Sequence, residues 1–123
     1  MAALGKFLRR GQFGLLLFFC PGCKTAHQVS VGEGPGPRWQ FNGNAEAPTF
    51  APSILCTGTQ IERDDGGKWT GEWLRGPDGQ PLKSICHSFM TDGRIQFLGD
   101  CTHALAGQTV DLPIFPGYRG ETL

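Results

Sequence analysis

The sequence predicts a mainly β, single compact domain of short antiparallel strands and hairpins, with a small α+β domain as the alternative. Glycine (19 residues) and proline (9) make up nearly a quarter of the 123 residues, which is typical of a chain with many turns. A hydrophobic fraction of 39%, with 9 phenylalanines and 3 tryptophans, is enough to form a core and argues against disorder. No stretch sustains the apolar spacing of a long amphipathic helix.

Short apolar or alternating stretches between turn signals place the strands in chain order. The apolar residues 13–20 predict a buried strand, followed by a Pro21-Gly22 turn. Later strands are expected at 26–31, 39–41 before Asn42-Gly43, 54–57, across a hairpin at 82–101 that turns at Asp92-Gly93, and at 109–112, with a helical turn at 103–107.

These elements divide the chain into a domain and two ends. Residues 1–12 are expected to be an N-terminal extension, residues 13–113 the domain, and residues 114–123 a C-terminal tail. Within the domain, the polar residues 58–81 predict an exposed flap or hairpin.

The register of the 82–101 hairpin decides which side chains share a face. A two-residue turn at Asp92-Gly93 places Cys86 on one face with Cys101, which then pairs with Ser84. A three-residue turn beginning at Thr91 places His87 on that face instead. A slip of one residue exchanges the two faces, so the sequence leaves the choice between Cys86 and His87 open.

Five cysteines, an odd number, favour a metal site over a disulfide framework. Zn²⁺ takes four ligands in a tetrahedron, and C-x-x-C spacing lets two sulfurs bind one ion. We expect a zinc-ribbon-like metal clip with ligands Cys20, Cys23, Cys86 and Cys101, and with His103 as the alternative fourth ligand. Buried reduced thiols and a redox C-x-x-C are the competing interpretations. Cys56 has no partner motif and is expected to be a core thiol.

Each histidine lies near a cysteine in the sequence, which favours a role in orienting metal ligands. The alternative is a general acid–base set around a catalytic zinc, made of His27, His87, His103 and Asp100. Other catalytic motifs are missing, including H-E-x-x-H, G-x-S-x-G, Walker A and the H-x-E and P-C-x-x-C motifs of zinc deaminases.

The charge balance argues against two classes of partner. Eleven basic and eleven acidic side chains cancel, so nucleic acid and anionic membranes are not expected partners. The apolar run at 13–19 is too short to span a membrane, and no small-residue cleavage site follows it. A host or phage protein is the expected partner, and the oligomeric state is left open.

Long motifs resemble a small family of uncharacterised bacteriophage and prophage proteins, often labelled "ammonia monooxygenase". The motifs are F-F-C-P-G-C-x3-H, W-x-F-N-G-N, P-T-F-x-P-S-I-L and C-H-S-F-x-x-D-G-R-I-Q-F-L-x-D-C-T-H-A-L-A-G-Q-T-V-D-L-P, within about residues 15–113. The resemblance implies a phage or prophage origin and the bacterial cytoplasm, but no established activity. The residues that match it are Cys20, Cys23, His27, Cys86, His87, Asp100, Cys101 and His103. Thiol-rich ligands in so small a chain do not support the monooxygenase label.

Together these observations favour a zinc-stabilised phage accessory protein that acts as a protein-interaction module, for instance against host defence. The exposed aromatic residues expected near loops could anchor such a partner. The alternative function is a small zinc-dependent hydrolase that uses the three histidines and Asp100. The sequence leaves open whether the chain is an enzyme, and a non-catalytic role is favoured.

Overall fold

Two antiparallel sheets and a projecting hairpin account for the secondary structure in a computed structural model, which describes residues 2–120. No helix occurs in this range, so the predicted mainly β fold is confirmed. The first sheet has the order β1 (Ala2–Leu4), β2 (Leu8–Arg10), β3 (Leu15–Cys20), β4 (Thr25–Ser30). The second has the order β11 (Thr109–Asp111), β10 (Arg94–Phe97), β9 (Lys83–Thr91), β6 (Phe50–Thr59), β5 (Gln40–Phe41).

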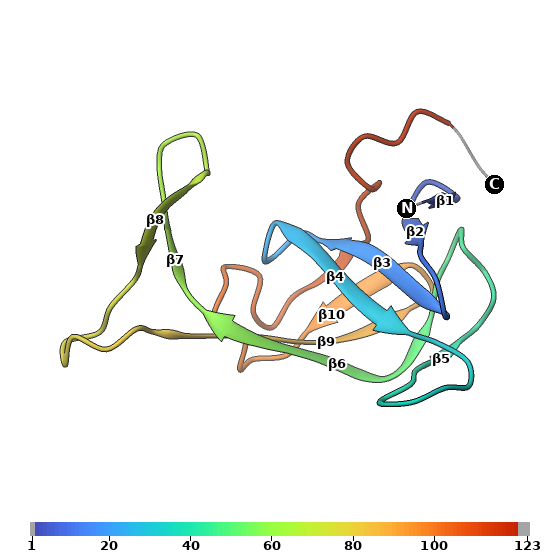
Figure 1. Cartoon of the computed structure of the whole chain (residues 1–123), viewed down its shortest axis with the longest axis horizontal. Coiled ribbons are helices and arrows are strands. Elements are labelled where there is room, and N and C mark those ends of the chain that lie inside the picture. The colour runs from blue at the N-terminus through green and yellow to red at the C-terminus, as the bar shows by residue number, and fades with distance from the viewer. Residues whose placement is uncertain (1, 121–123) are drawn as a thin grey trace.

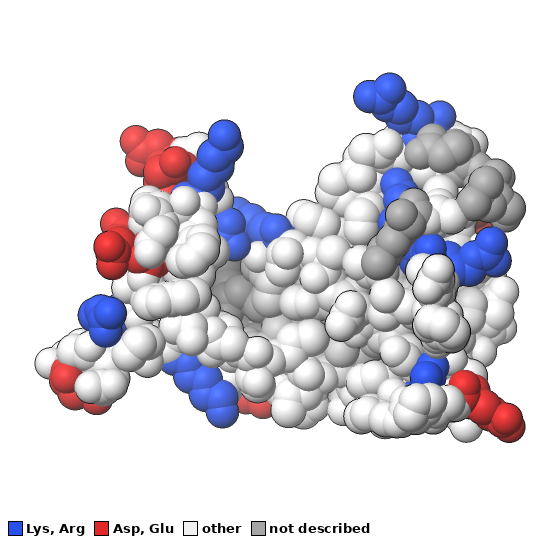
Figure 2. Space-filling view, in the orientation of Figure 1, with Lys and Arg blue, Asp and Glu red and all other residues white. Residues whose placement is uncertain are grey.

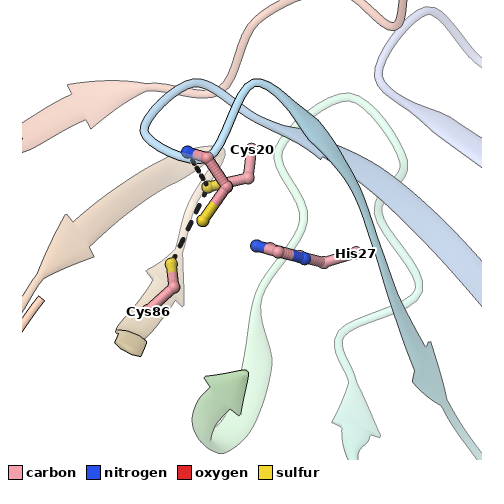
Figure 3. Close-up of side chains that lie close together, drawn as sticks. Cys20, His27 and Cys86 are labelled. Atoms are coloured by element: carbon pink, nitrogen blue, oxygen red, sulfur yellow. Dashed lines mark hydrogen bonds between the residues drawn. The ribbon is translucent and has the colours of Figure 1, made fainter. Parts of the chain in front are cut away.

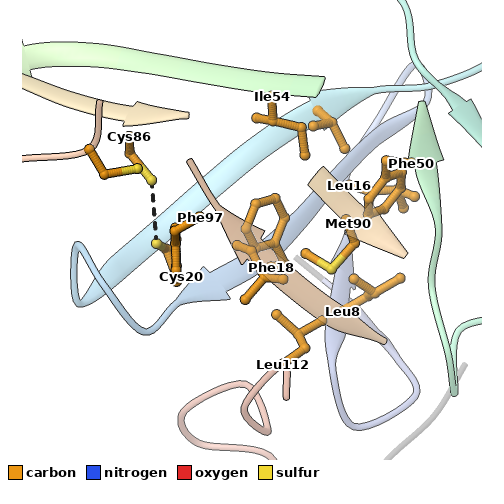
Figure 4. Close-up of a cluster of buried hydrophobic side chains, with 13 residues drawn as sticks. Leu8, Leu16, Phe18, Cys20, Phe50, Ile54, Cys86, Met90, Phe97 and Leu112 are labelled. Atoms are coloured by element: carbon orange, nitrogen blue, oxygen red, sulfur yellow. Dashed lines mark hydrogen bonds between the residues drawn. The ribbon is translucent and has the colours of Figure 1, made fainter. Parts of the chain in front are cut away.

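The first sheet lies across the second, and the core fills the space between them (Figures 1 and 4). Alternate residues of β3 are buried, because successive side chains of a strand point to opposite faces. Strands β1 and β2 lie within the expected N-terminal extension and pair with each other. Strand β2 also pairs with β3 and adds Leu8 to the core. The other fully buried large side chains include Phe18, Val29, Met90, Ile95 and Phe97.

The β9–β10 hairpin has the two-residue turn that the sequence predicts. Met90 pairs with Ile95, and Asp92 and Gly93 have φ angles of 50° and 77°. This register buries Cys86 beside the core and turns His87 to the opposite face.

The predicted pairing of Cys101 with Ser84 is wrong. β10 ends at Phe97, and the chain then makes a turn in which the Cys101 N–H donates to the Leu98 carbonyl at 3.2 Å. Thr102 rather than Cys101 rejoins β9, since its N–H donates to the Ile85 carbonyl at 2.9 Å.

Strands β7 (Ile61–Arg63) and β8 (Trp69–Trp73) form the flap, which projects from the body of the molecule (Figure 1). Trp69 and Trp73 pack against each other with a centroid distance of 5.0 Å and ring planes tilted by 38°, and each is at least 40% exposed. The residues at 103–107, expected as a helical turn, form hydrogen-bonded turns. A helix long and apolar enough to cross a membrane is absent from the described part of the chain.

Candidate functional site

Ser53, His87 and Asp100 form a continuous chain of hydrogen bonds on the outer face of the second sheet. The Asp100 Oδ2 atom lies 3.2 Å from His87 Nδ1, and His87 Nε2 lies 3.2 Å from Ser53 Oγ. A carboxylate only accepts hydrogen bonds, so it places the proton of a neutral imidazole on Nδ1. Nε2 is then free to accept the proton of the Ser53 hydroxyl, which is the arrangement of a serine nucleophile with its general base.

Neighbouring strands place Ser53 beside His87. Leu55 of β6 pairs with His87 of β9, so Ser53 stands on β6 two residues from the partner of His87. The Trp39 indole N–H donates to the Ser53 carbonyl at 3.2 Å and tethers this part of β6. Asp100 comes from the turn after β10 rather than from a strand.

The serine site is open to a large substrate. The His87 and Asp100 side chains are 28% and 53% exposed. Leu55 and Phe89, which lie on β6 and β9 next to His87, are 57% and 43% exposed. An exposed site with apolar neighbours on a sheet suits an extended polypeptide better than a small molecule enclosed in a cavity.

A cluster of sulfur and imidazole groups lies on the other side of β9. Ligand atoms of Cys20, Cys23, His27 and Cys86 all lie within 4.8 Å of one another and could hold a metal ion. Figure 3 shows the His27 ring directed toward the sulfurs, with 3.8 Å between Cys20 Sγ and Cys86 Sγ. The cluster joins the two sheets, because Cys86 belongs to β9 and the others to the β3–β4 hairpin.

The electrostatics of this cluster favour a cation. Hydrogen bonds with Cys23 and Cys86 hold the pKa of the Cys20 thiol far below its usual range. Interactions with Cys20 and Cys23, together with burial, raise the pKa of Cys86. Burial opposes the charge on His27, but the thiols of Cys20 and Cys23 outweigh it and raise its pKa to about 12. Deprotonation of Cys86 beside the Cys20 thiolate is therefore unfavourable unless a divalent cation balances the negative charge.

The two histidines near the sulfurs differ in their hydrogen bonds. His27 Nε2 is buried and has no hydrogen-bond partner of ordinary geometry in the described structure. His103 Nδ1 accepts the Leu105 N–H at 3.2 Å, so a neutral His103 carries its proton on Nε2. That Nε2 lies 3.5 Å from Cys86 Sγ, where its N–H can donate to the sulfur. His27 Nε2 therefore has no hydrogen bond to lose when a metal ion replaces its proton, whereas His103 Nε2 offers its N–H to Cys86 Sγ.

Cys101, an expected zinc ligand, falls in a second group with Cys86 and His103 rather than in the group of four. Its thiol makes hydrogen bonds with the backbone of His87 instead. Cys56 pairs with Cys86 across β6 and β9 and packs partly buried against the core.

A pocket of about 440 Å³ adjoins the cluster of Cys20, Cys23, His27 and Cys86. Figure 2 shows the molecular surface hollowed between the flap and the body. Cys23, Arg63, Leu74, Ile85 and His103 are among the residues that line the pocket. Arg63 crosses from the flap, and its guanidinium donates to the Cys23 carbonyl at 3.4 Å.

The structure separates the residues proposed for a zinc hydrolase. His87 contacts both Asp100 and Ser53, whereas His27 and His103 lie with the sulfurs on the opposite side of β9. The reason is the alternation of the strand, which turns Cys86 and His87 to opposite faces. Ser53 was not among the site residues predicted from the sequence, although it is the serine of the motif P-T-F-x-P-S-I-L.

Comparison with known proteins identifies a family. Residues 3–98 match the family model "Bacterial ubiquitination-like system serine protease (BubE)". Searches of curated proteins and of solved structures returned no match. The family match overturns the expected phage interaction module with an anti-defence role, and it gives no support to a zinc hydrolase or to a phage origin.

Proposed function

The chain belongs to the BubE family of serine proteases of bacterial ubiquitination-like systems, and we propose on this basis that Ser53 is its nucleophile. The observation that carries the proposal is the hydrogen-bonded series Ser53–His87–Asp100, with two contacts of 3.2 Å. Geometry and roles, rather than chain order, identify such a triad. The substrate that this site fits is an extended segment of a protein from such a system.

Each side chain then has a defined role in peptide hydrolysis. The Ser53 oxygen attacks the carbonyl carbon while His87 Nε2 takes the hydroxyl proton. Asp100 accepts the Nδ1 proton in a hydrogen bond and stabilises the imidazolium that forms. His87 gives its proton to the departing amine, which leaves an ester on Ser53. Water, deprotonated by His87, hydrolyses the ester and restores the serine.

A fluorophosphonate probe tests this assignment without knowledge of the natural substrate. An activated serine displaces fluoride from phosphorus and keeps the phosphonyl group. We expect one adduct per chain, mapped to Ser53 by tandem mass spectrometry, in about 1:1 stoichiometry for a single nucleophile. Ser84, on β9 but outside the triad, is the internal control. Absence of an adduct, or an adduct at another residue, contradicts the proposal.

We further infer that Cys20, Cys23, His27 and Cys86 hold a structural Zn²⁺. Three sulfurs and one imidazole nitrogen match the tetrahedral ligand set of structural zinc sites. The buried, unpartnered His27 Nε2 supports His27 as the fourth ligand, and His103 then donates to Cys86. All five cysteines are free, which supports a reducing compartment such as the bacterial cytoplasm.

X-ray absorption at the zinc edge checks this ligand set. We expect about one zinc per chain, with three sulfurs near 2.3 Å and one nitrogen near 2.0 Å. His27→Gln is expected to lower zinc retention, whereas the matched variant His103→Gln retains the ion. Four sulfur neighbours would identify Cys101 as the fourth ligand. Loss of zinc only in His103→Gln would instead identify His103.

A further inference from the structure

The backbone of His87 meets β10 through an unusual hydrogen-bond pair. In a regular antiparallel ladder, His87 and its opposite residue, Leu98, would exchange two N–H···O bonds. The Leu98 N–H does donate to the His87 carbonyl at 2.9 Å. The His87 N–H, however, donates to Cys101 Sγ at 3.2 Å, and the Leu98 carbonyl accepts the Cys101 N–H instead.

The thiol thus takes the place of a backbone carbonyl in the ladder. Cys101 Sγ also donates to the His87 carbonyl at 3.3 Å, so one side chain engages both backbone polar groups of His87. Cys101 is only 8% exposed, and water therefore does not readily replace its sulfur.

This exchange lets the chain leave the sheet where Asp100 is needed. Because Leu98 pairs with His87 and Thr102 with Ile85, the residues between them form a turn beside β9. Asp100 stands in that turn, directly before Cys101, and its carboxylate reaches His87 Nδ1. A regular continuation of β10 would have no such turn to present the carboxylate to the ring.

We propose that Cys101 is a positioning residue for the serine site, holding the backbone of His87 against the turn that carries Asp100. Only the expected effect on catalysis rests on the proposed function, and the structural role of Cys101 does not. The Cys101 sulfur is hydrogen-bonded to the backbone of His87 and is not a member of the group formed by Cys20, Cys23, His27 and Cys86. The effect reaches the nucleophile through the His87–Asp100 contact, since Ser53 depends on a correctly oriented imidazole.

The experiment compares Cys101→Ala, Cys101→Ser and Thr102→Val. Thr102 is the matched control, because its hydroxyl also bonds the backbone of β9 but at Ile85 rather than His87, accepting the Ile85 N–H at 3.0 Å. Two readouts are used, the rate of fluorophosphonate labelling and the low-field proton NMR signal of His87 Nδ1–H. Asp100→Asn identifies that signal by removing the carboxylate.

We expect Cys101→Ala to lower the labelling rate about 10- to 100-fold, the usual effect of a small misplacement. The same variant should lose the low-field signal, Cys101→Ser should recover most of both, and Thr102→Val should keep both. Zinc content should stay unchanged in all three variants.

Three results overturn the proposal. They are an unchanged signal in Cys101→Ala, an equal loss in Thr102→Val, and loss of zinc in both Cys101 variants, which would make Cys101 a ligand. The NMR signal requires no turnover. If Ser53 is not the nucleophile, the labelling arm fails in the wild type while the NMR arm still decides the role of Cys101.

Discussion

Ser53→Ala is expected to abolish covalent labelling and to lower the hydrolysis of p-nitrophenyl acetate about 10⁴- to 10⁶-fold, as in other serine hydrolases that lose the nucleophile. The reason is that His87 Nε2 activates the Ser53 hydroxyl, and alanine has no hydroxyl group to act as the nucleophile. A stopped spectrophotometric assay at saturating ester measures the change in kcat.

The fold should survive this substitution. Ser53 is half-buried, and its hydroxyl bonds His87 near the surface, so its loss costs about 1 kcal/mol. Thermal unfolding of the variant checks this point. Ser84→Ala, on the neighbouring strand β9, is the matched control for loss of a serine hydroxyl. A Ser53→Ala enzyme that keeps its ester hydrolysis would show that the triad is not the catalytic centre.

Removal of the proposed zinc ion is expected to lower Tm by about 20 °C. The three thiols and His27 come from both sheets, and Figure 4 shows Cys20 and Cys86 at one end of the core, so without the ion this end would lose its bridge between the sheets. The buried thiols near Cys86 would also lose their compensating charge. Calorimetry before and after treatment with a strong chelator measures the shift.

Two controls accompany the metal experiment. Added Zn²⁺ should restore the original Tm, whereas Mg²⁺, which prefers oxygen ligands, should not. Zinc should also be lost more easily as the pH falls, because protons compete with the metal for the three sulfurs. If chelation leaves Tm unchanged, the cluster is a set of reduced thiols and the structural zinc is excluded.

Local sequence signals predicted a large part of the fold. The Asp92-Gly93 turn, the alternation on either side of it and the C-x-x-C turn are short-range features, and the structure shows all three as expected. The nearness of Cys20, Cys23 and Cys86 was expected from the proposed four-ligand zinc site, although the hairpin register left the choice between Cys86 and His87 open.

The serine site could not be predicted in the same way. Its members are brought together by the pairing of β6 with β9, which is a long-range contact, and the chain order Ser53, His87, Asp100 follows no familiar motif. Asp100 reaches His87 only because a thiol replaces a carbonyl in the ladder, and no local pattern announces that exchange.

The adjacency of Cys86 and His87 on β9 sets a strict limit on the length of this strand. The faces on which Cys86 and His87 lie depend on their distance in sequence from the Asp92-Gly93 turn. Adding or removing one residue in between would move every preceding side chain of the strand to the opposite face. A single-residue insertion between His87 and the turn would move Cys86 to the surface and His87 into the core at the same time. In strand β9, changes of length are therefore expected to be more damaging than conservative substitutions at positions other than Cys86 and His87.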